Sequence, residues 1–317
     1  MSQPLVSIVI ATYRSRRDHL SAAIISALGQ TWASIEVIVC DDSPDDGLRA
    51  FVVGFNDLRL RYRHNTPPLG VARNHWVSFS EAQGEYLAVL NHDDWLAPTF
   101  IEELAQALQR QPDAVLAFCD HWIIDVRGRR RDADTEHNSG IWGRLKLAPD
   151  MHRPFPALVA EQTIPMAMGA LFRRSALPTT LPDEAGPAYD LWLAYLLCRG
   201  GGGAWYARKR LSAWRSHAAN LTSGGGLAWL RGSATCWQAM SHDPLFASQH
   251  HLTRHKAALG FYGCAFRAWR DGHRVACADY ALRSLRARLT LRGLCACLLP
   301  MLPMQFAAFR PFRRRAI

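Results

Sequence analysis

The feature that most constrains this chain is a regular alternation of short apolar runs with amphipathic segments over residues 5–125. The runs are rich in valine, isoleucine and leucine, which is typical of strands buried on both faces of a sheet. Ser15 is the expected N-cap of the first helix. The alternation predicts an α/β fold with a mostly parallel sheet and helices on both faces. The pattern places strands at 5–10, 35–42, 58–65, 85–90 and 114–125, and helices at 15–30, 47–55, 70–83 and 99–112.

Polar side chains follow three of these strands: Thr12 and Tyr13 the first, Asp41 and Asp42 the second, Asp93 and Asp94 the fourth. In parallel sheets ligands bind at the carboxyl ends of the strands, so we expect a site there. The adjacent carboxylates of "LNHDDWL" are costly to half-bury, and a cation, a cationic substrate or solvent must compensate them. A simpler alternative is that this acidic pair caps the helix that begins near Pro98.

No glycine-rich phosphate loop follows the first strand, where the sequence is "ATYRSRRD". Both the dinucleotide motif G-x-G-x-x-G and the P-loop motif G-x-x-x-x-G-K are missing at this point. A bound diphosphate must therefore be neutralised in another way. The common alternative is Mg²⁺ or Mn²⁺, held by one or two carboxylates together with the phosphates.

Five further segments occur in an order typical of a known enzyme family: "VSIVIATYRSRRDHLSAAIISALGQTWASIEVIVCDDSPDDG", "LGVARNHW", "GEYLAVLNHDDWLAP", "YDLWLAYLL" and "LSAWRSH". Together they resemble the family-2 inverting glycosyltransferases of the GT-A (Rossmann-like) fold, over about residues 5–225. The resemblance implies a metal-dependent enzyme of cell-surface polysaccharide biosynthesis. Such an enzyme moves a sugar, with inversion, from a nucleoside diphosphate-sugar to a hydroxyl of a glycan or lipid-linked acceptor.

The resemblance also implies a nucleotide site at the ends of the first two strands. Tyr13 would lie against the base, with Ala11 and Thr12 beside it. Asp42 would accept the N–H group of the base, and Asp41 would support the turn.

For the diphosphate and the sugar, the resemblance implies a second group of residues. Asp93 and His217 would hold Mn²⁺ or Mg²⁺, and Asp94 would lie next to the donor sugar. Arg73 would approach the diphosphate or the acid cluster, and Arg215 would lie near the phosphates. The chemistry requires such a set, because the departing diphosphate develops negative charge that a metal and a cation stabilise.

The general base is harder to assign, because the acidic pair of many relatives is replaced here by Pro187 and Ala188. A carboxylate is needed to take the proton of the acceptor hydroxyl. Asp190 is the favoured candidate, and Glu184 or Asp183 is the alternative. Asp190 at the start of "DLWLAYLL" also fits an acid that only interacts with the helix dipole.

The region from about residue 227 is helical and basic, which divides the chain into predicted domains at 1–226 and 227–317. Gly272 is expected at the turn between two helices, and residues 199–203 are expected to form a turn from a helix to a strand. Residues 223–226 are a candidate hinge of a loop that closes over the donor.

The net charge is +10, and after Asp279 the sequence has no acidic residue. The apolar stretch 293–309 is broken by prolines, so we expect it to lie on an anionic membrane surface; a buried terminal helix is the alternative. Most of the excess positive charge comes from the eight arginines that follow Asp279: Arg283, Arg286, Arg288, Arg292, Arg310, Arg313, Arg314 and Arg315.

The remaining features narrow the class of protein. The N-terminus lacks signal-peptide features and the eight cysteines form no disulfide or zinc pattern, so we expect a cytoplasmic enzyme, peripheral on the inner membrane face. Cys295 and Cys297 are expected to be small buried thiols. His251 and His255 are expected on a solvated helix face, and no nucleic acid is expected as partner. Two rival functions remain: a nucleotidyltransferase on a similar fold, and a non-catalytic sugar-nucleotide or polyanion-binding protein, which Asn91 in place of the usual acid makes conceivable.

Overall fold

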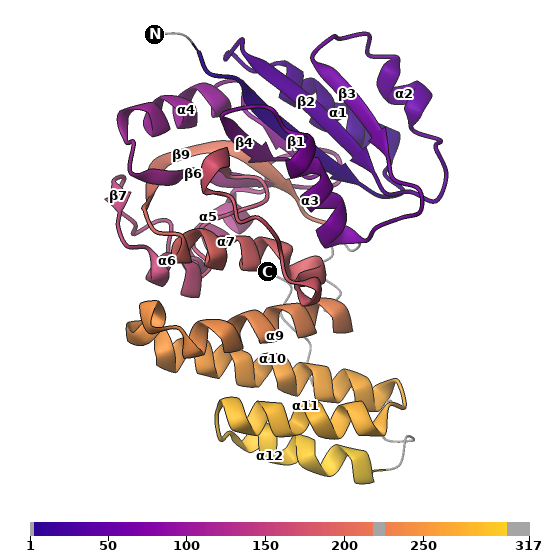
Figure 1. Ribbon diagram of the computed structural model, residues 1–317, viewed down its shortest axis with the longest axis vertical. Helices are drawn as coiled ribbons and strands as arrows, with labels where there is room; N and C mark the ends of the chain where they lie inside the picture. The colour runs from indigo at the N-terminus through magenta and orange to yellow at the C-terminus, as the bar shows by residue number, and fades with distance from the viewer. Residues whose placement is uncertain (1–2, 218–225, 303–317) are drawn as a thin grey trace. The chain divides into compact units, whose positions relative to one another are not determined.

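The computed structural model describes residues 3–217 and 226–302 and contains two compact units (Figure 1). The sheet unit comprises the chain up to Leu181 together with Leu196–His217. The helical unit comprises Pro182–Tyr195 together with the chain after His217. The segment Pro182–Tyr195, which lies inside the predicted first domain, therefore groups with the helical unit.

Within the described residues, nine strands form one sheet of order β3-β2-β1-β4-β8-β6-β9-β5, with β7 pairing β9 (Figure 1). The α/β prediction is confirmed, and β3, β2, β1 and β4 run parallel as expected. β8 pairs antiparallel with both β4 and β6, which makes the sheet mixed. The strands are β1 (Val6–Thr12), β2 (Ile35–Asp41), β3 (Leu60–His64), β4 (Tyr86–Val89), β5 (Trp95–Leu96), β6 (Ala114–Ile124), β7 (Met151–His152), β8 (Ala170–Arg173) and β9 (Gly203–Arg215).

Helices cover both faces of this sheet, and the four helices predicted before residue 112 are all present (Figure 1). The expected N-cap Ser15 is wrong: α1 begins at Arg17 without a side-chain cap, because the Ser15 hydroxyl contacts Thr12 Oγ1 instead. The helices and short turns of this unit are α1 (Arg17–Leu28), α2 (Arg49–Val53), α3 (Val71–Glu81), α4 (Phe100–Arg110), α5 (Asp132–Ile141), α6 (Pro156–Ala160) and the 3₁₀ turn η1 (Arg174–Ala176).

The core of the sheet unit forms where the apolar face of α1 meets β1 and β2. Leu20 and Ile24 of α1 are fully buried, as are Ile8 and Val37 of the strands. Burial of each such side chain stabilises the fold by about 1.5–3 kcal/mol. This core holds the carboxyl ends of the strands in fixed register, with Thr12 opposite Asp41.

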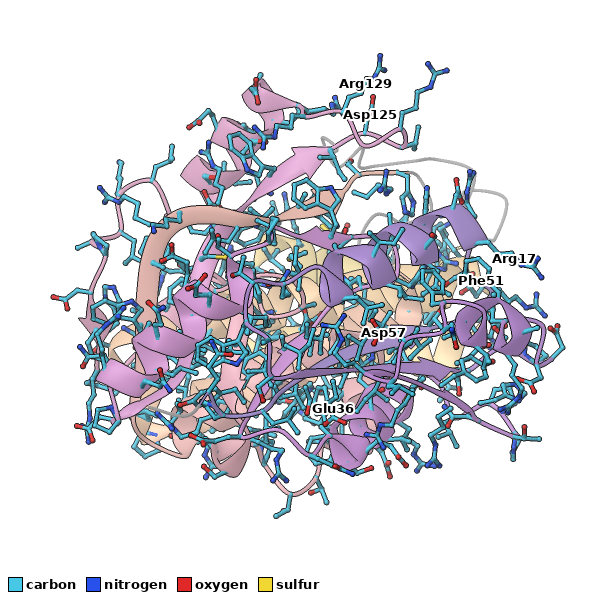
Figure 2. The ribbon with its side chains drawn as sticks, turned by 90° about the horizontal axis from the view of Figure 1, so that it is seen from above. Arg17, Glu36, Phe51, Asp57, Asp125 and Arg129 are labelled. Atoms are coloured by element: carbon cyan, nitrogen blue, oxygen red, sulfur yellow. The ribbon has the colours of Figure 1, made fainter. Side chains whose placement is uncertain are left out.

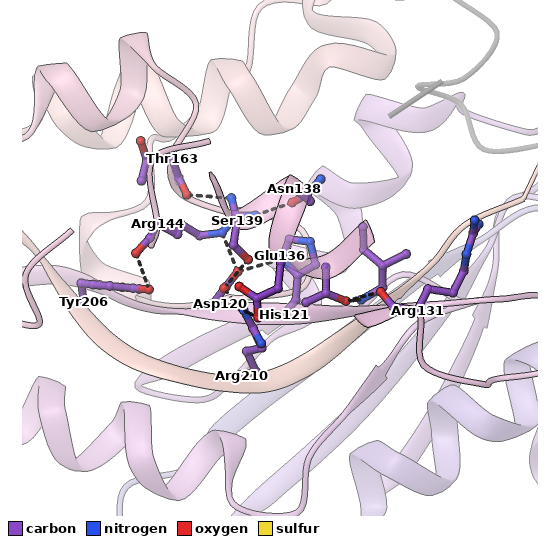
Figure 3. Close-up of polar contacts among 12 residues, drawn as sticks. Asp120, His121, Arg131, Glu136, Asn138, Ser139, Arg144, Thr163, Tyr206 and Arg210 are labelled. Carbon is purple, nitrogen blue, oxygen red and sulfur yellow. Dashed lines mark hydrogen bonds and ion pairs between the residues drawn. The ribbon is translucent and has the colours of Figure 1, made fainter. Parts of the chain in front are cut away.

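The region between β6 and β8 is held by a buried polar network (Figure 3). Asp120 of β6 accepts hydrogen bonds from Arg144 Nε at 2.6 Å and from Ser139 Oγ at 2.5 Å. Arg144 is 2% exposed and also donates to Thr163 O. Burial and then the charge of Arg144 lower the pKa of the neighbouring His121 to about 3, so this imidazole is neutral. The network fixes α5 and the following loop against β6.

The turn after β6 is closed by one carboxylate. Asp125 Oδ1 accepts from the backbone N–H groups of Arg127 and Arg129, and Asp125 Oδ2 pairs with Arg129 Nη2 at 2.8 Å (Figure 2). The turn presents the carbonyls of Asp125 and Val126 toward β9, where Arg215 binds them.

The helical unit stacks its helices in chain order, α9 on α10, α10 on α11 and α11 on α12 (Figure 1). Gly272 adopts φ 82° between α10 and α11, so the predicted turn is confirmed. A Cβ at Gly260 would lie 2.8 Å from the Ala234 side chain, which shows how closely α9 and α10 approach. The elements are α9 (Leu227–His242), α10 (His250–Arg270), α11 (Arg274–Ala287), α12 (Leu291–Leu298) and the 3₁₀ turns η2 (Asp183–Ala188), η3 (Pro244–Gln249) and η4 (Leu299–Met301).

Several smaller predictions concern the segments that flank these elements. The turn predicted at 199–203 is confirmed, since α7 (Tyr189–Arg199) ends there and β9 begins at Gly203. The predicted hinge at 223–226 lies outside the described residues except for Gly226. The prediction that Cys295 is buried is wrong, because α12 turns this residue to solvent. Within the described residues, none of the helices has the length and apolar character needed to cross a membrane.

Candidate functional site

Asp41 organises the turn at the end of β2. Its Oδ1 accepts from the Ser43 backbone N–H at 2.9 Å and from Ser43 Oγ at 2.6 Å, and its Oδ2 accepts from Tyr62 OH at 2.8 Å. The carboxyl is fully buried, so these bonds replace its water. Burial and then the hydrogen bond to Asp41 raise the pKa of Tyr62, which stays neutral.

Asp42 holds the loop that leads into α3. Its Oδ1 accepts from Leu69 N at 2.7 Å and from Asn65 Nδ2 at 3.2 Å, and its Oδ2 accepts from Gly70 N at 2.8 Å. Both carboxylate oxygens are thus already hydrogen-bonded within the protein. A nucleotide base would have to share an oxygen that the loop already uses.

Asn74, in the segment "ARN", is a site residue that the sequence did not single out. Its Nδ2 donates to Thr12 O at 3.3 Å and to Cys40 O at 3.1 Å, and its Oδ1 accepts from Asn65 Nδ2 at 2.9 Å. One buried side chain therefore ties together the ends of β1 and β2 and the loop after β3. The sequence feature that could have identified Asn74 is its position directly after Arg73.

The residues predicted around the base differ in exposure. Tyr13 is 51% exposed after β1, and the Arg14 guanidinium lies 5.4 Å from its ring centre. Ala11 and Thr12 are buried in β1. Arg73 is exposed in the first turn of α3. Tyr13 is thus an aromatic surface at a strand end, available for stacking.

Asp93, Arg215 and His217 form one cluster, although 122 residues separate Asp93 from Arg215 in the chain. His217 Nε2 lies 2.8 Å from Asp93 Oδ2, and Arg215 Nε donates to Asp93 O at 2.7 Å. Arg215 is 5% exposed, and its Nη1 donates to Asp125 O and Val126 O. The guanidinium therefore positions backbone around the acid in addition to providing charge.

Asp94 is fully buried and its two oxygens are bonded to different segments. Oδ1 accepts from Arg215 N at 2.7 Å and Oδ2 accepts from Asn91 Nδ2 at 2.8 Å. Burial and then the charge of Asp93 raise its pKa well above the ordinary value. The alternative that the two acids cap a helix is wrong, since α4 begins after Thr99 without a side-chain cap.

His19 belongs to this cluster and was missed by the sequence analysis. Its ring stacks on that of His217 with centres 6.2 Å apart, and its Nε2 is buried with no hydrogen-bond partner among the residues that the structure describes. Burial and then the charge of Arg215 lower the pKa of His19, so the neutral imidazole has a free lone pair or proton to offer. Its place in the first turn of α1, directly after β1, was the available signal.

A divalent cation fits the chemistry of this cluster. Among the residues that the structure describes, no three His, Cys, Asp or Glu side chains gather closely enough to hold a metal by themselves. Asp93 and His217 supply one carboxylate and one imidazole, and the ring of His19 stacks on that of His217. Mg²⁺ and Mn²⁺ sites of this kind take their remaining ligands from substrate phosphates and water.

The candidate base Asp190 lies in the helical unit, in the first turn of α7. Its Oδ1 accepts from Leu191 N at 2.8 Å. Loss of water around this half-buried carboxyl raises its pKa above the ordinary value. The alternatives Asp183 and Glu184 are exposed on η2.

Comparison with known proteins gives one family model, described as glycosyl transferase family 2, which matches residues 7–179. Among curated proteins, the chain is 37% identical over 192 residues to the Escherichia coli protein WfaP, named a UDP-Glc:alpha-D-GlcNAc-diphosphoundecaprenol beta-1,3-glucosyltransferase. This match covers 61% of the chain and 70% of WfaP. For the two relatives that match first, the chain spans only 38% and 43% of their lengths.

Solved structures share the fold at low sequence identity. TarS of S. aureus, in complex with UDP-GlcNAc, has a TM-score of 0.63 at 14% identity, covering 95% of this chain and 86% of that one. The mannosyltransferase PcManGT of Pyrobaculum calidifontis, in complex with GDP-Man and Mn²⁺, has a TM-score of 0.58 at 15% identity, covering 95% and 88%. At these identities the likeness confirms the GT-A type of fold.

Proposed function

The chain belongs to glycosyl transferase family 2, and on that premise we propose that it transfers a sugar from a nucleoside diphosphate-sugar to a hydroxyl of a lipid-linked or glycan acceptor. The observation that carries the proposal is the cluster of Asp93, Arg215 and His217 at the carboxyl edge of the sheet. The UDP-GlcNAc bound by TarS and the GDP-Man bound by PcManGT support such a donor, and the diphosphoundecaprenol-linked substrate in the name of WfaP supports a lipid-linked acceptor.

In the proposed reaction, Asp93 and His217 would hold Mn²⁺ or Mg²⁺ against the donor diphosphate. The metal would neutralise the negative charge that develops on the leaving group. Arg215 keeps Asp93 in place by binding its backbone carbonyl, and Asp94 in turn accepts from the Arg215 N–H. The acids are therefore preorganised before a donor binds, which lowers the cost of binding it.

The transfer itself breaks the bond between the sugar carbon and the diphosphate oxygen and forms a bond to the acceptor oxygen. We assign the removal of the acceptor proton to Asp190. Its raised pKa makes it a stronger base than an ordinary aspartate while it remains ionised above that pKa. A single displacement of this kind inverts the configuration at the sugar carbon.

Titration calorimetry with UDP, in the presence and absence of Mn²⁺, tests the donor site. Wild-type protein should bind UDP more tightly with Mn²⁺, and Asp93→Ala should lose that gain. Asp18→Ala is the matched control, because Asp18 is an exposed aspartate that pairs with Arg16 on the surface. Equal gains in Asp93→Ala and wild type would refute the assignment.

Turnover separates the proposal from its rivals. We expect UDP release from a sugar donor only when a hydroxyl acceptor such as a GlcNAc-diphospholipid is added. Pyrophosphate release from a nucleoside triphosphate would instead indicate a nucleotidyltransferase. Tight binding with neither product would indicate a binding protein.

A further inference from the structure

The helical unit contains a cationic pocket that the proposed reaction does not use. The cavity of about 390 Å³ is lined by Ala247, Ser248, His250, His251, Arg254 and Arg288. Four of these six residues are histidine or arginine, and none is acidic. Such a lining favours an anion over a neutral or cationic ligand.

The pocket is built where α10 begins and α11 ends. His250 and His251 are the first residues of α10, and Arg254 follows one turn later. Arg254 Nε donates to Ala287 O at 2.7 Å, which fixes the end of α11 against α10. Arg288 follows α11 directly and makes no ion pair with a carboxylate in the part of the chain that the structure describes.

The electrostatic potential around the pocket is positive, and the neighbouring His255 shows its effect. Burial and then the charges of Arg288, His251 and Arg292 lower the pKa of His255. Within the described ranges, the Nδ1 atom of His255 is also buried without a hydrogen-bond partner. The last acidic residue of the sequence, Asp279, pairs with Arg283 at 2.9 Å. An external anion would relieve this excess charge.

The helix α12, which follows the pocket residue Arg288 in the sequence, exposes its large apolar side chains to solvent. Leu291, Leu294, Cys295 and Leu298 are exposed and lie on one stripe at helical spacing. The residues that face inward are small: a Cβ at Gly293 would lie 2.8 Å from Leu285 Cδ2. Leu291 is 77% exposed and Leu298 is 58% exposed. A helix with its leucines in water and its glycine inside presents a face suited to an apolar partner.

The charge next to the exposed leucines determines which kind of partner this surface can bind. Arg286 and Arg288 precede α12 in the sequence and Arg292 lies within it, so this segment is both apolar and cationic. A second copy of the chain would bring the same positive charge to the contact. The segment 303–317 would also bring positive charge, since it has four arginines and no acid. An anionic bilayer supplies both opposite charge and an apolar layer.

We infer that the pocket and the α12 stripe together form a docking site for anionic phospholipid membranes. The phosphate of a lipid headgroup binds in the pocket between His250, Arg254 and Arg288, and the leucines of α12 insert at the boundary between the headgroups and the acyl chains. The inference rests on the proposed function in that it explains how the enzyme reaches a lipid-linked acceptor. Vesicle binding tests it without any substrate.

The test is co-sedimentation of the full chain with phosphatidylcholine vesicles that contain or lack phosphatidylglycerol. We expect binding only to the anionic vesicles, weakened by high salt. Arg288→Glu and Leu294→Glu should each weaken it about tenfold. The matched controls are Arg110→Glu and Leu58→Glu, at exposed positions of the sheet unit, and both should bind as wild type. Unchanged UDP binding verifies that each variant is folded.

Three outcomes would overturn the docking site. The first is equal vesicle binding by all four variants. The second is strong protection of α12 from hydrogen exchange without vesicles: protection that rises with protein concentration indicates a second copy, and protection that does not indicates coverage by the chain's own segment. The third is wild-type protein that transfers sugar to a soluble acceptor but does not bind anionic vesicles, which refutes the docking site alone. Intact vesicle binding without transfer to any acceptor refutes the proposed function alone.

Discussion

Replacement of Arg144 by methionine should destabilise the sheet unit by about 3 kcal/mol. The guanidinium is 2% exposed and binds Asp120, whose side chain is 7% exposed. Removal of one partner of a buried ion pair typically costs 3–5 kcal/mol, because the other charge remains buried. The lower end applies here, since Ser139 Oγ and Arg210 Nε at 3.3 Å still face Asp120. A loss of this size raises the opening equilibrium constant about a hundredfold.

The cost should depend on pH in a direction that the structure fixes. Burial alone would raise the pKa of Asp120, but the charge of Arg144 and the Ser139 hydrogen bond hold it below the ordinary value. The wild-type network therefore adds stability above the unfolded pKa and loses it as pH falls through the folded pKa. In Arg144→Met the pKa of Asp120 rises above its unfolded value, so the variant's deficit should shrink as pH falls from neutral.

The assay is hydrogen exchange of the β6 amides in increasing urea, which follows the sheet unit separately from the helical unit. Arg153→Met is the matched control, because Arg153 pairs with Asp113 on the surface with half of its side chain exposed. This control should leave exchange unchanged. Asp120→Asn with Arg144→Met should recover part of the loss, since no charge is left buried. A loss below about 1 kcal/mol, or one that is equal at neutral and acid pH, would refute the reasoning.

Three further predictions concern the site and its support. In Asp190→Asn, the rate of sugar transfer should fall about 10²–10⁴-fold. In the wild type, kcat/KM should fall as pH decreases through the raised pKa of Asp190. A decline in kcat/KM that occurs only at or below the ordinary aspartate pKa would contradict the base assignment. Gly84→Ala should lower Tm by a stability loss of about 1–3 kcal/mol, because its Cβ would lie 2.6–2.8 Å from three backbone atoms, whereas a Cβ at Gly200 would make only ordinary contacts, the nearest at 3.4 Å, so Gly200→Ala should leave Tm unchanged. Asp42→Asn should speed hydrogen exchange at Gly70, since the amide oxygen keeps the two donors of Oδ1, Leu69 N and Asn65 Nδ2, and the NH₂ group then faces the Gly70 N–H; unchanged exchange would show that the loop does not depend on this bond.

The parallel half of the sheet could be predicted because its signals are local. β1, α1 and β2 each carry their own periodicity, and the strand ends carry their own polar residues. The antiparallel β8 could not be predicted, since its four residues form a strand only by pairing with β4 and β6, which are distant in the sequence. The exposure of Cys295 was missed for a similar reason: apolar composition predicts burial, whereas the inward positions of α12 are taken by smaller residues.

The site residues could be predicted by type but not by partner. The acids after β4 were visible in the sequence, yet nothing local indicated that Arg215 would donate its backbone N–H to Asp94 and its side chain to Asp93. His19 was missed because a single histidine on an amphipathic helix resembles ordinary surface. It became informative only when its ring was found against His217.

The presence of Asn91 in place of the usual acid has a physical explanation in this cluster. Asp94 is fully buried beside Asp93, and both burial and that neighbouring charge oppose its ionisation. Asn91 donates to Asp94 Oδ2 at 2.8 Å, which favours the charged form. An aspartate at position 91 would instead place a second carboxylate at hydrogen-bond distance and force the pair to share a proton. The amide thus supports a buried acid in this chain, and Asp93 keeps the carboxylate that faces His217 and the proposed cation.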